Sequence, residues 1–254
     1  MFRGCKALKK INFNNFNAEN IKYMGYLFYH CESLVKIDFP NFRAKKNTNM
    51  SYIFCGCSSL KEIDLSNFNY ENVKSIHDLF SDCSSLKKVN LGDFYIKNNI
   101  ALSNMFSCCK LLETINFFNP QLINISNMFN MFYDFKSLRE IDFSNFNTKN
   151  VENMYSMFCG SSSLKKINLS NFITENIVKM DYMFNKCSSL EAVDVSNFNT
   201  NNVLFINHIF SECSSLKKIV LFNLNNENPI DMKYMFHECY SLNELTIPNR
   251  IMKI

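Results

Sequence analysis

Cysteine is the most regularly spaced reactive residue in this chain. The sequence has 254 residues and 11 cysteines, and eight of these are separated by 26 residues or by a multiple of 26. The eight are Cys5, Cys31, Cys57, Cys83, Cys109, Cys187, Cys213 and Cys239. Thiols in such a row could bind a metal ion, form disulfides or fill a hydrophobic core.

Packing in a core is the interpretation that the neighbouring residues favour. Phe135 and Ser161 replace cysteine in two copies of the pattern, and rows of Phe and Leu flank the thiols. A free cysteine behaves there as a small hydrophobic residue. Stacked segments would hold the thiols about 5 Å apart, close to the Cα separation of disulfides, so distance alone leaves disulfides open. Because Cys55 and Cys57 lack a second pair at zinc-site spacing, we expect reduced core thiols with neither metal nor cofactor.

Catalytic groups do not gather at one point of the pattern. The four histidines, His30, His77, His208 and His237, take four different positions within the 26 residues. The serines recur as Ser-Ser pairs, which indicates a turn and not a unique site. No phosphate loop, nucleophile elbow or zinc-binding helix is matched. An active site needs unlike groups at one place, so we expect a protein without catalytic residues, which is not an enzyme.

Acidic and amide side chains form a second row at one position of the same pattern. Asn or Asp stands there in eight of ten copies. Calcium takes about 6–8 oxygen ligands, but the Asn members supply no carboxylate and no Gly-Asp calcium motif occurs. We therefore expect a polar surface row and no metal site. Its acidic members are Asp38, Asp64, Asp142 and Asp194.

All of these residues belong to one repeat of 26 residues. Phe recurs ten times at this interval, from Phe2 to Phe236, without insertion or deletion. We number repeat positions from this Phe, which is position 0. Leu follows at position 6 in every copy, from Leu8 to Leu242, and apolar residues follow at positions 9 and 11. A period of 26 residues lies within the range of leucine-rich repeats, roughly 20–29.

Each copy predicts a strand, a turn and a short helix. The stretch Leu60–Leu65 reads Leu-x-x-Ile-x-Leu, which predicts a strand with positions 9 and 11 inward and position 10 outward. Val151, Met154, Met157 and Phe158 are spaced as on one face of a helix. Stacked units would share one core. The sequence therefore predicts an α/β leucine-rich-repeat solenoid of about ten coils, with a parallel β-sheet on one face and short helices on the other.

Two asparagine rows are expected to support the stacking. Position 13 holds Asn in nine of ten copies, directly after the strand, and an amide there can satisfy turn groups of its own coil and the next. Position 18 holds Asn in eight of nine copies and is expected at the start of the helix. Twelve of the thirteen methionines occupy positions 22 or 25 and are expected to fill the core.

The charges of the chain are balanced and interspersed. Lys and Arg number 27, Asp and Glu number 23, and the net charge is +4, so we expect no nucleic-acid partner. No stretch reaches the roughly 20 apolar residues that span a bilayer, and no apolar signal segment follows Met1. The apolar fraction of 47% is sufficient for a buried core, and we expect a single solenoid domain over residues 1–254.

The repeat Met-Phe-x-x-Cys-Ser-Ser-Leu-Lys-x-Ile-Asp-Leu-Ser-Asn-Phe-Asn-Thr-x-Asn-Val, clearest over Met157–Phe172 and Met183–Val203, resembles the BspA-like leucine-rich repeats of bacterial and protist surface proteins. It is most similar to the variant of mycoplasma-type lipoproteins. The resemblance implies a surface or secreted protein that acts in adhesion or protein–protein contact. Because this stretch carries no lipobox or export signal and many thiols without an evident partner, a cytoplasmic scaffold that binds a protein partner is the alternative.

The strand side is the expected binding face, since solenoid curvature creates an extended surface there for a protein or a glycan. Exposed apolar residues and the row of acidic and basic groups are the candidates for partner contacts. The candidate residues are Phe118, Val220, Phe222, Asp38, Asp64, Asp142, Asp194 and Arg139. Neither end shows a polar capping unit, so we expect a neighbouring segment, another domain or self-association to cover the ends.

Overall fold

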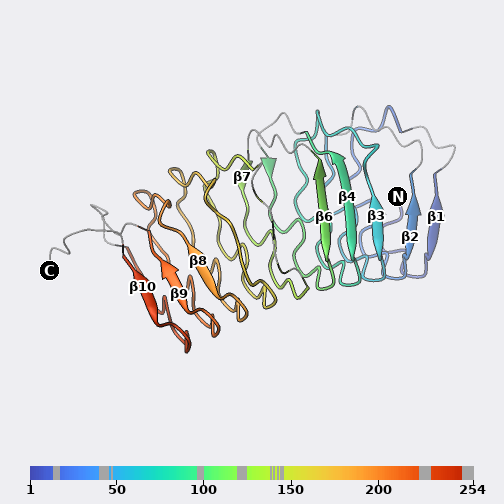
Figure 1. Cartoon of the computed structure of the whole chain (residues 1–254). Helices are drawn as coiled ribbons and strands as arrows, with labels where there is room; N and C mark the ends of the chain where they lie inside the picture. The colour runs from blue at the N-terminus through green and yellow to red at the C-terminus, as the bar shows by residue number, and fades with distance from the viewer. Residues whose placement is uncertain are drawn as a thin grey trace.

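Alternating polar and apolar residues at repeat positions 8–10 form the strands at the front of the molecule. The chain winds as a parallel β-solenoid of about eight turns, which we call coils (Figure 1). The computed structural model describes residues 1–13, 18–39, 46, 48–95, 100–118, 125–137, 139, 141, 143, 146–222 and 230–247, except for the side chains of 116–118.

Ten strands occur in the described part of the chain, and most have only three residues. They are β1 (Lys10–Asn12), β2 (Lys36–Asp38), β3 (Glu62–Asp64), β4 (Lys88–Asp93), β5 (Ile100–Ala101), β6 (Thr114–Phe118), β7 (Ile125–Asn127), β8 (Ala192–Asp194), β9 (Lys218–Val220) and β10 (Glu244–Thr246).

The front strands pair in parallel, in the register that the repeat predicts. Strands β1 and β2 form one sheet, β3, β4 and β6 a second, and β8, β9 and β10 a third. Ile11 lies opposite Ile37, and Val193 lies opposite Ile219, which is an offset of 26 residues in each case. The predicted parallel sheet and its inward and outward positions are therefore confirmed.

Strand β4 is longer than its neighbours and contains an irregularity where the repeat has Gly92. The register with β6 shifts between Asn90 and Asp93, and Gly92 has a φ of 60°. A Cβ atom on Gly92 would lie 2.6 Å from Cα of Ser66 in the preceding coil. Only glycine fits this close approach, and it allows the turn after the strand to continue into Asp93.

A second parallel ladder runs along the opposite side of the solenoid, and we call it the back ladder. It consists of β5 paired with β7 and of single bridges at repeat position 21. Tyr23, Asn49 and Ser75 form successive bridges at one end. The series from Asn127 to Asp231 continues it at the other end. Each coil is thus hydrogen-bonded to its neighbours on two sides.

The short helices that the spacing predicted are absent from every described residue, so this prediction was wrong. Successive β-turns take their place. The N–H of Leu27 donates to the carbonyl of Met24 at 3.1 Å, and the N–H of Cys31 donates to that of Phe28 at 2.9 Å. Turns of this type put an inward residue every three or four positions, which is also the spacing of a helical face. The solenoid also has about eight turns, so the prediction of about ten coils was too high.

Left-handed backbone conformations make these turns possible. Tyr26 has a φ of 61° and His30 a φ of 53°, although non-glycine residues disfavour this region by about 1–3 kcal/mol. The N–H of Tyr26 donates to the carbonyl of Ser51 at 3.1 Å, and the N–H of His30 donates to that of Cys55 at 2.8 Å. These bonds between coils offset the strain, and they repeat along the chain.

Stacked rings and thiols fill the core. Phe54 is fully buried and stacks on Phe28 and Phe80, with ring centroids 5.7 and 5.5 Å apart. The thiol of Cys57 donates to the carbonyl oxygen of Phe28 at 3.2 Å, and the other buried row members repeat this contact. All eleven cysteines are free, and burial raises the pKa of Cys83 well above its ordinary value. The prediction of core thiols is confirmed for six of the eight members of the row, whereas Cys5 is exposed and Cys239 is half-buried.

The asparagine rows connect coils. The Nδ2 group of Asn197, at position 13, donates to the carbonyls of Leu169 at 3.1 Å and Phe172 at 3.2 Å. At position 18, the Nδ2 group of Asn176 donates to the carbonyl of Lys149 at 2.8 Å. The second row was expected at a helix start, and it instead links one turn of chain to the preceding turn.

Candidate binding surfaces

Carboxylates of the acidic row on the front face accept hydrogen bonds from nearby backbone N–H groups. Asp64 Oδ1 accepts from the N–H of Ser66 at 2.8 Å, and Asp194 Oδ1 accepts from that of Ser196 at 2.9 Å. Burial alone would raise the pKa of Asp64, but the hydrogen bonds from Ser66 and Asn90 outweigh it and lower the pKa. These carboxylates end the strands, and both remain exposed to solvent.

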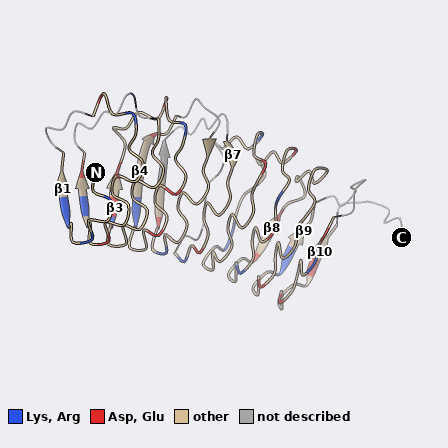
Figure 2. Ribbon diagram, turned by 180° about the vertical axis from the view of Figure 1, so that it is seen from behind, with Lys and Arg blue, Asp and Glu red and all other residues tan. Residues whose placement is uncertain are grey.

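The other charged candidates also lie on the front. Asp38 is half-buried and pairs with Lys36 at 3.0 Å. Arg139 is exposed, and Asp142 lies outside the described residues. Lysines stand at the starts of β1, β4 and β9, and an acidic residue starts β10, so charges of both signs occur on this face (Figure 2).

The apolar candidates behave differently from one another. Phe222 is fully buried in the core, so its prediction as an exposed anchor was wrong. Ser is the most frequent residue at position 12, but a Phe there gains about 1.5–3 kcal/mol by leaving water and turns inward. Val220 is half-buried on the front and lies opposite Thr246. The backbone of Phe118 ends β6, and its side chain is outside the described part.

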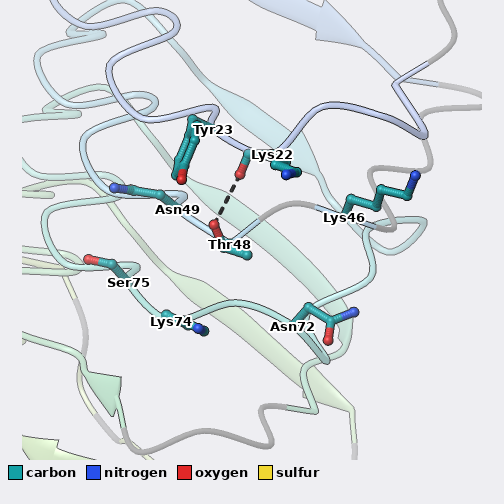
Figure 3. Close-up of a pocket in the computed structure, with 8 residues that line it drawn as sticks. All are labelled: Lys22, Tyr23, Lys46, Thr48, Asn49, Asn72, Lys74 and Ser75. Atoms are coloured by element: carbon teal, nitrogen blue, oxygen red, sulfur yellow. Dashed lines mark hydrogen bonds between the residues drawn. The ribbon is translucent and has the colours of Figure 1, made fainter.

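A groove beside the back ladder is lined by three lysines, and we call it the lysine groove. It has a volume of about 680 Å³ and is open to solvent (Figure 3). Three successive coils contribute its lining. The lining residues are Lys22, Tyr23, Lys46, Thr48, Asn49, Asn72, Lys74 and Ser75.

Backbone bonds between coils fix the floor of the lysine groove. The N–H of Thr48 donates to the carbonyl of Lys22 at 2.8 Å, and the N–H of Lys74 donates to that of Thr48 at 2.9 Å. The hydroxyl of Thr48 also donates to the carbonyl of Lys22, at 3.3 Å (Figure 3). The lysine backbones are therefore held in a row, while the side chains of Lys22, Lys46 and Lys74 are exposed.

Charge in the lysine groove has one sign. No Asp or Glu is among its lining residues. Within the described part of the chain, none of its three lysines lies within 4.0 Å of a carboxylate oxygen. Lys46 Nζ donates to Oδ1 of Asn20 at 2.9 Å, which leaves its charge uncompensated. The groove is thus a local concentration of positive charge on a chain of nearly balanced composition.

A second groove occupies the same repeat positions nearer the C-terminus, and we call it the asparagine groove. It has a volume of about 540 Å³ and is lined by Asn150, Glu152, Asn176, Val178 and Asn202. Glu152 stands at the repeat position of Lys22, and Val178 at that of Thr48. The two grooves share a backbone and differ in charge.

Sequence analysis missed the lysine groove. Lys22 and Lys74 are 52 residues apart, and their common side of the molecule depends on the back ladder. The usable signal was a departure at position 20, which holds lysine in these copies and Glu152, Val178 or Leu204 in later ones. When the side chain at one repeat position changes between copies and the backbone does not, the fold does not require that side chain, and it is a candidate for binding at the surface.

Two aromatic clusters on the back were also missed. At one end the guanidinium of Arg3 lies over the rings of Tyr26 and Tyr29, at 5.2 and 5.1 Å from their centroids. At the other end His208 stacks between Tyr182 and Tyr234, at 4.8 Å from each. Since the ring faces contact one another, both clusters mainly hold neighbouring coils together.

One solved structure shows the same fold, and a second one is similar over most of the chain at a lower score. A leucine-rich repeat protein from Bacteroides ovatus is 17% identical with a TM-score of 0.57, and the match covers 96% of this chain but only 62% of that one. A leucine-rich cell surface protein from Faecalibacterium prausnitzii is 16% identical over 96% of this chain and 84% of its own, with a TM-score of 0.31. None of the curated proteins matches the sequence. No described helix has the length and apolar character that a bilayer crossing needs.

A family model covers nearly the whole chain. It matches residues 1–118 and 123–249, which include every repeat, and its description is "Mycoplasma protein of unknown function, DUF285". The match agrees with the repeat, with the solenoid and with the leucine-rich-repeat structures, and it confirms the resemblance to BspA-like proteins. The chain belongs to the DUF285 family of BspA-like leucine-rich-repeat proteins.

Proposed function

We propose that this protein is a non-enzymatic adhesin-like protein, displayed at a cell surface, whose front face binds a protein partner. The observation that carries the proposal is the front face itself. Exposed charges of both signs lie across it in register, as Glu62 of β3 lies opposite Lys88 of β4. Such an extended, regular surface suits contact with another macromolecule and offers no point where unlike catalytic groups converge.

Surface display is supported by the family. The BspA-like repeats that this chain resembles belong to surface proteins, and the similar protein from Faecalibacterium prausnitzii is called a cell surface protein. Glycans are a second class of ligand for such a face, since Asx and Lys side chains alternate across it. The protein partner is favoured because the front face is broad.

Charge reversal on the front face tests this proposal. Lys87, Lys165 and Lys217 are exposed there, and their combined change to Glu should abolish capture of host surface proteins by the immobilised chain. Lys179→Glu on the back is the matched control and should leave capture unchanged. Equal capture by the front variant and the unaltered chain would overturn the front-face assignment.

A cytoplasmic scaffold is the second candidate, and the free thiols favour it. Eleven cysteines without a disulfide are typical of a reducing compartment. Protease treatment of intact cells separates the two candidates. Cleavage of the protein on intact cells supports display at the surface, and full protection until lysis supports the scaffold.

A further inference from the structure

The lysine groove is the feature of the molecule that the proposed function does not use. It lies beside the back ladder, away from the front strands, and its three lysines have no carboxylate within the lining. Uncompensated lysines gathered in one groove raise the local concentration of anions. The occupant should therefore carry negative charge.

Packing does not require lysine at these positions. The residue at position 20 is Lys22 or Lys74 in two copies and Val178 or Leu204 in two others. Val178 is 37% exposed and Leu204 is 46% exposed, so the site accepts apolar side chains without burying them. The same backbone ladder forms with either type. The lysines serve the surface and not the fold.

The geometry of the groove fits an extended anion and not a single small ion. Lys22 and Lys74 are two coils apart, which is about 10 Å at the spacing of paired strands. Lys46 stands on the intervening coil, at position 18 instead of 20, and projects to one side (Figure 3). The positive charges therefore follow the solenoid axis in a staggered row, instead of converging on one point. A chain with repeated negative groups matches this arrangement.

Neutral groups in the groove indicate what kind of chain this is. Tyr23 is 76% exposed, and Thr48, Asn49 and Ser75 line the floor beside it. A phenol ring with adjacent hydroxyl and amide groups suits a sugar, whose apolar CH faces alternate with hydroxyls. Single-stranded nucleic acid would use several aromatic rings in succession, and the lining has one. An acidic peptide is usually held by Arg forks, and no Arg is among the described residues of the lining.

We propose that the lysine groove binds a sulfated glycan chain. The sulfates contact Lys22, Lys46 and Lys74, and a sugar ring lies against Tyr23. The site is separate from the front face, so the test of glycan binding is independent of the protein contact proposed above. A molecule with both sites would hold a protein on one side and a polyanionic sugar on the other.

Heparin, a sulfated glycan, is the probe for the test. We expect the full chain to bind heparin, measured by calorimetry at 50 and 150 mM salt, and the double variant Lys22→Ala/Lys74→Ala to bind at least tenfold more weakly. By counterion release, the slope of log affinity on log salt should fall by about two, one for each lysine removed. The matched control, Lys165→Ala/Lys217→Ala on the front face, removes the same charge and should keep the affinity within about twofold.

Two further arms complete the test. Tyr23→Ala should weaken heparin binding without changing the salt slope, which separates ring contact from charge. Desulfated heparin, poly-glutamate and single-stranded DNA should compete at least tenfold less well than heparin. The proposal is overturned if the Lys22/Lys74 variant binds as the unaltered chain does, if the front control loses as much, or if poly-glutamate or DNA competes equally. Circular dichroism confirms that each variant is folded.

Discussion

The lysine groove and the asparagine groove occupy the same place on different coils, yet only one is positively charged. Residues at repeat positions 18 and 20 of three successive coils line both grooves, and both rest on backbone bonds between those coils. The lysine groove is also lined by Tyr23, Asn49 and Ser75 at position 21. Glu152 replaces the lysine of the first groove, and Asn176 stands where the first has Lys46. The repeat therefore determines where a groove forms, and a few side chains outside the core determine what the groove can bind.

The largest effect expected concerns the core beneath both grooves. Phe54 and Phe184 are buried at position 0 and stack on rings in both neighbouring coils. We expect Phe54→Ala and Phe184→Ala to lower the free energy of unfolding by about 3–5 kcal/mol each, measured by urea denaturation. The exposed Phe205→Ala should change it by less than about 0.5 kcal/mol. A loss of unfolding free energy at only one of the two buried sites would contradict the equivalence of the coils.

A smaller loss is expected where a Thr hydroxyl joins two neighbouring C-terminal coils. The buried hydroxyl of Thr148 donates to the carbonyl of Ile173 at 2.9 Å and accepts from its N–H at 2.8 Å. Thr148→Val leaves both backbone groups unpaired and should cost about 2 kcal/mol of unfolding free energy. Thr148→Ser keeps the contact and serves as the control. Ala18 and Tyr70 take this position in earlier coils, so the effect has no counterpart there.

Lysines introduced into the asparagine groove test directly whether charge explains the difference between the two grooves. Glu152 and Leu204 match Lys22 and Lys74 in repeat position and in separation. We expect Glu152→Lys/Leu204→Lys to raise heparin affinity at least tenfold in a chain whose own lysine groove carries Lys22→Ala/Lys74→Ala. The control is Lys added at Ser66 and Ser196, which are exposed on other repeat positions. No gain from the transplant would mean that charge and backbone alone do not make the site.

The smallest effect expected is a difference in thiol acidity between the two regions. Burial, together with the nearby carboxylates of Asp78 and Asp82, raises the pKa of Cys55 to about 12. Burial raises the pKa of Cys159 to about 11, because Lys186 partly opposes it. Alkylation of Cys159 by iodoacetamide should therefore accelerate at a lower pH than that of Cys55, as measured in variants that retain only one of the two thiols. Lys186→Gln should raise the pKa of Cys159 towards that of Cys55. An unchanged pH profile of alkylation would show that Lys186 is not the cause of the difference.

The same thiols affect stability in alkaline solution. Their pKa values in the folded chain lie above the ordinary value of 9.0, so folding disfavours the thiolates. Stability is fully present below pH 9 and is lost as pH rises towards about 11 and 12. The melting temperature should fall over this range, and less so in Cys55→Ala/Cys159→Ala.

The sequence was sufficient for the front of the molecule and insufficient for the back. Alternation at positions 9–11 has one structural meaning, so the register of Ile11 with Ile37 followed from the repeat. The spacing of Val151, Met154 and Met157 has two structural meanings, because a helix and a series of turns both place such residues inward. Left-handed residues such as Tyr26 carry no signal, since they are not Gly or Asn.

Site prediction failed for a related reason. Phe222 was expected at the surface because Ser is the most frequent residue at its repeat position, in four of ten copies, but a larger apolar side chain turns into the core. The lysine groove depends on residues that share a repeat position only approximately, as Lys46 and Lys74 do. Their proximity follows from how the coils wind and not from any local motif.

Each coil of this solenoid is hydrogen-bonded to the coil before it and the coil after it, as the bonds from Phe28 to Ile53 and from Phe54 to Leu79 illustrate. A gene that gains or loses a whole unit of 78 nucleotides would therefore encode a chain whose remaining junctions are unchanged. Recombination between copies can lengthen or shorten such a protein in single steps, and each step changes the distance between its two grooves while preserving both.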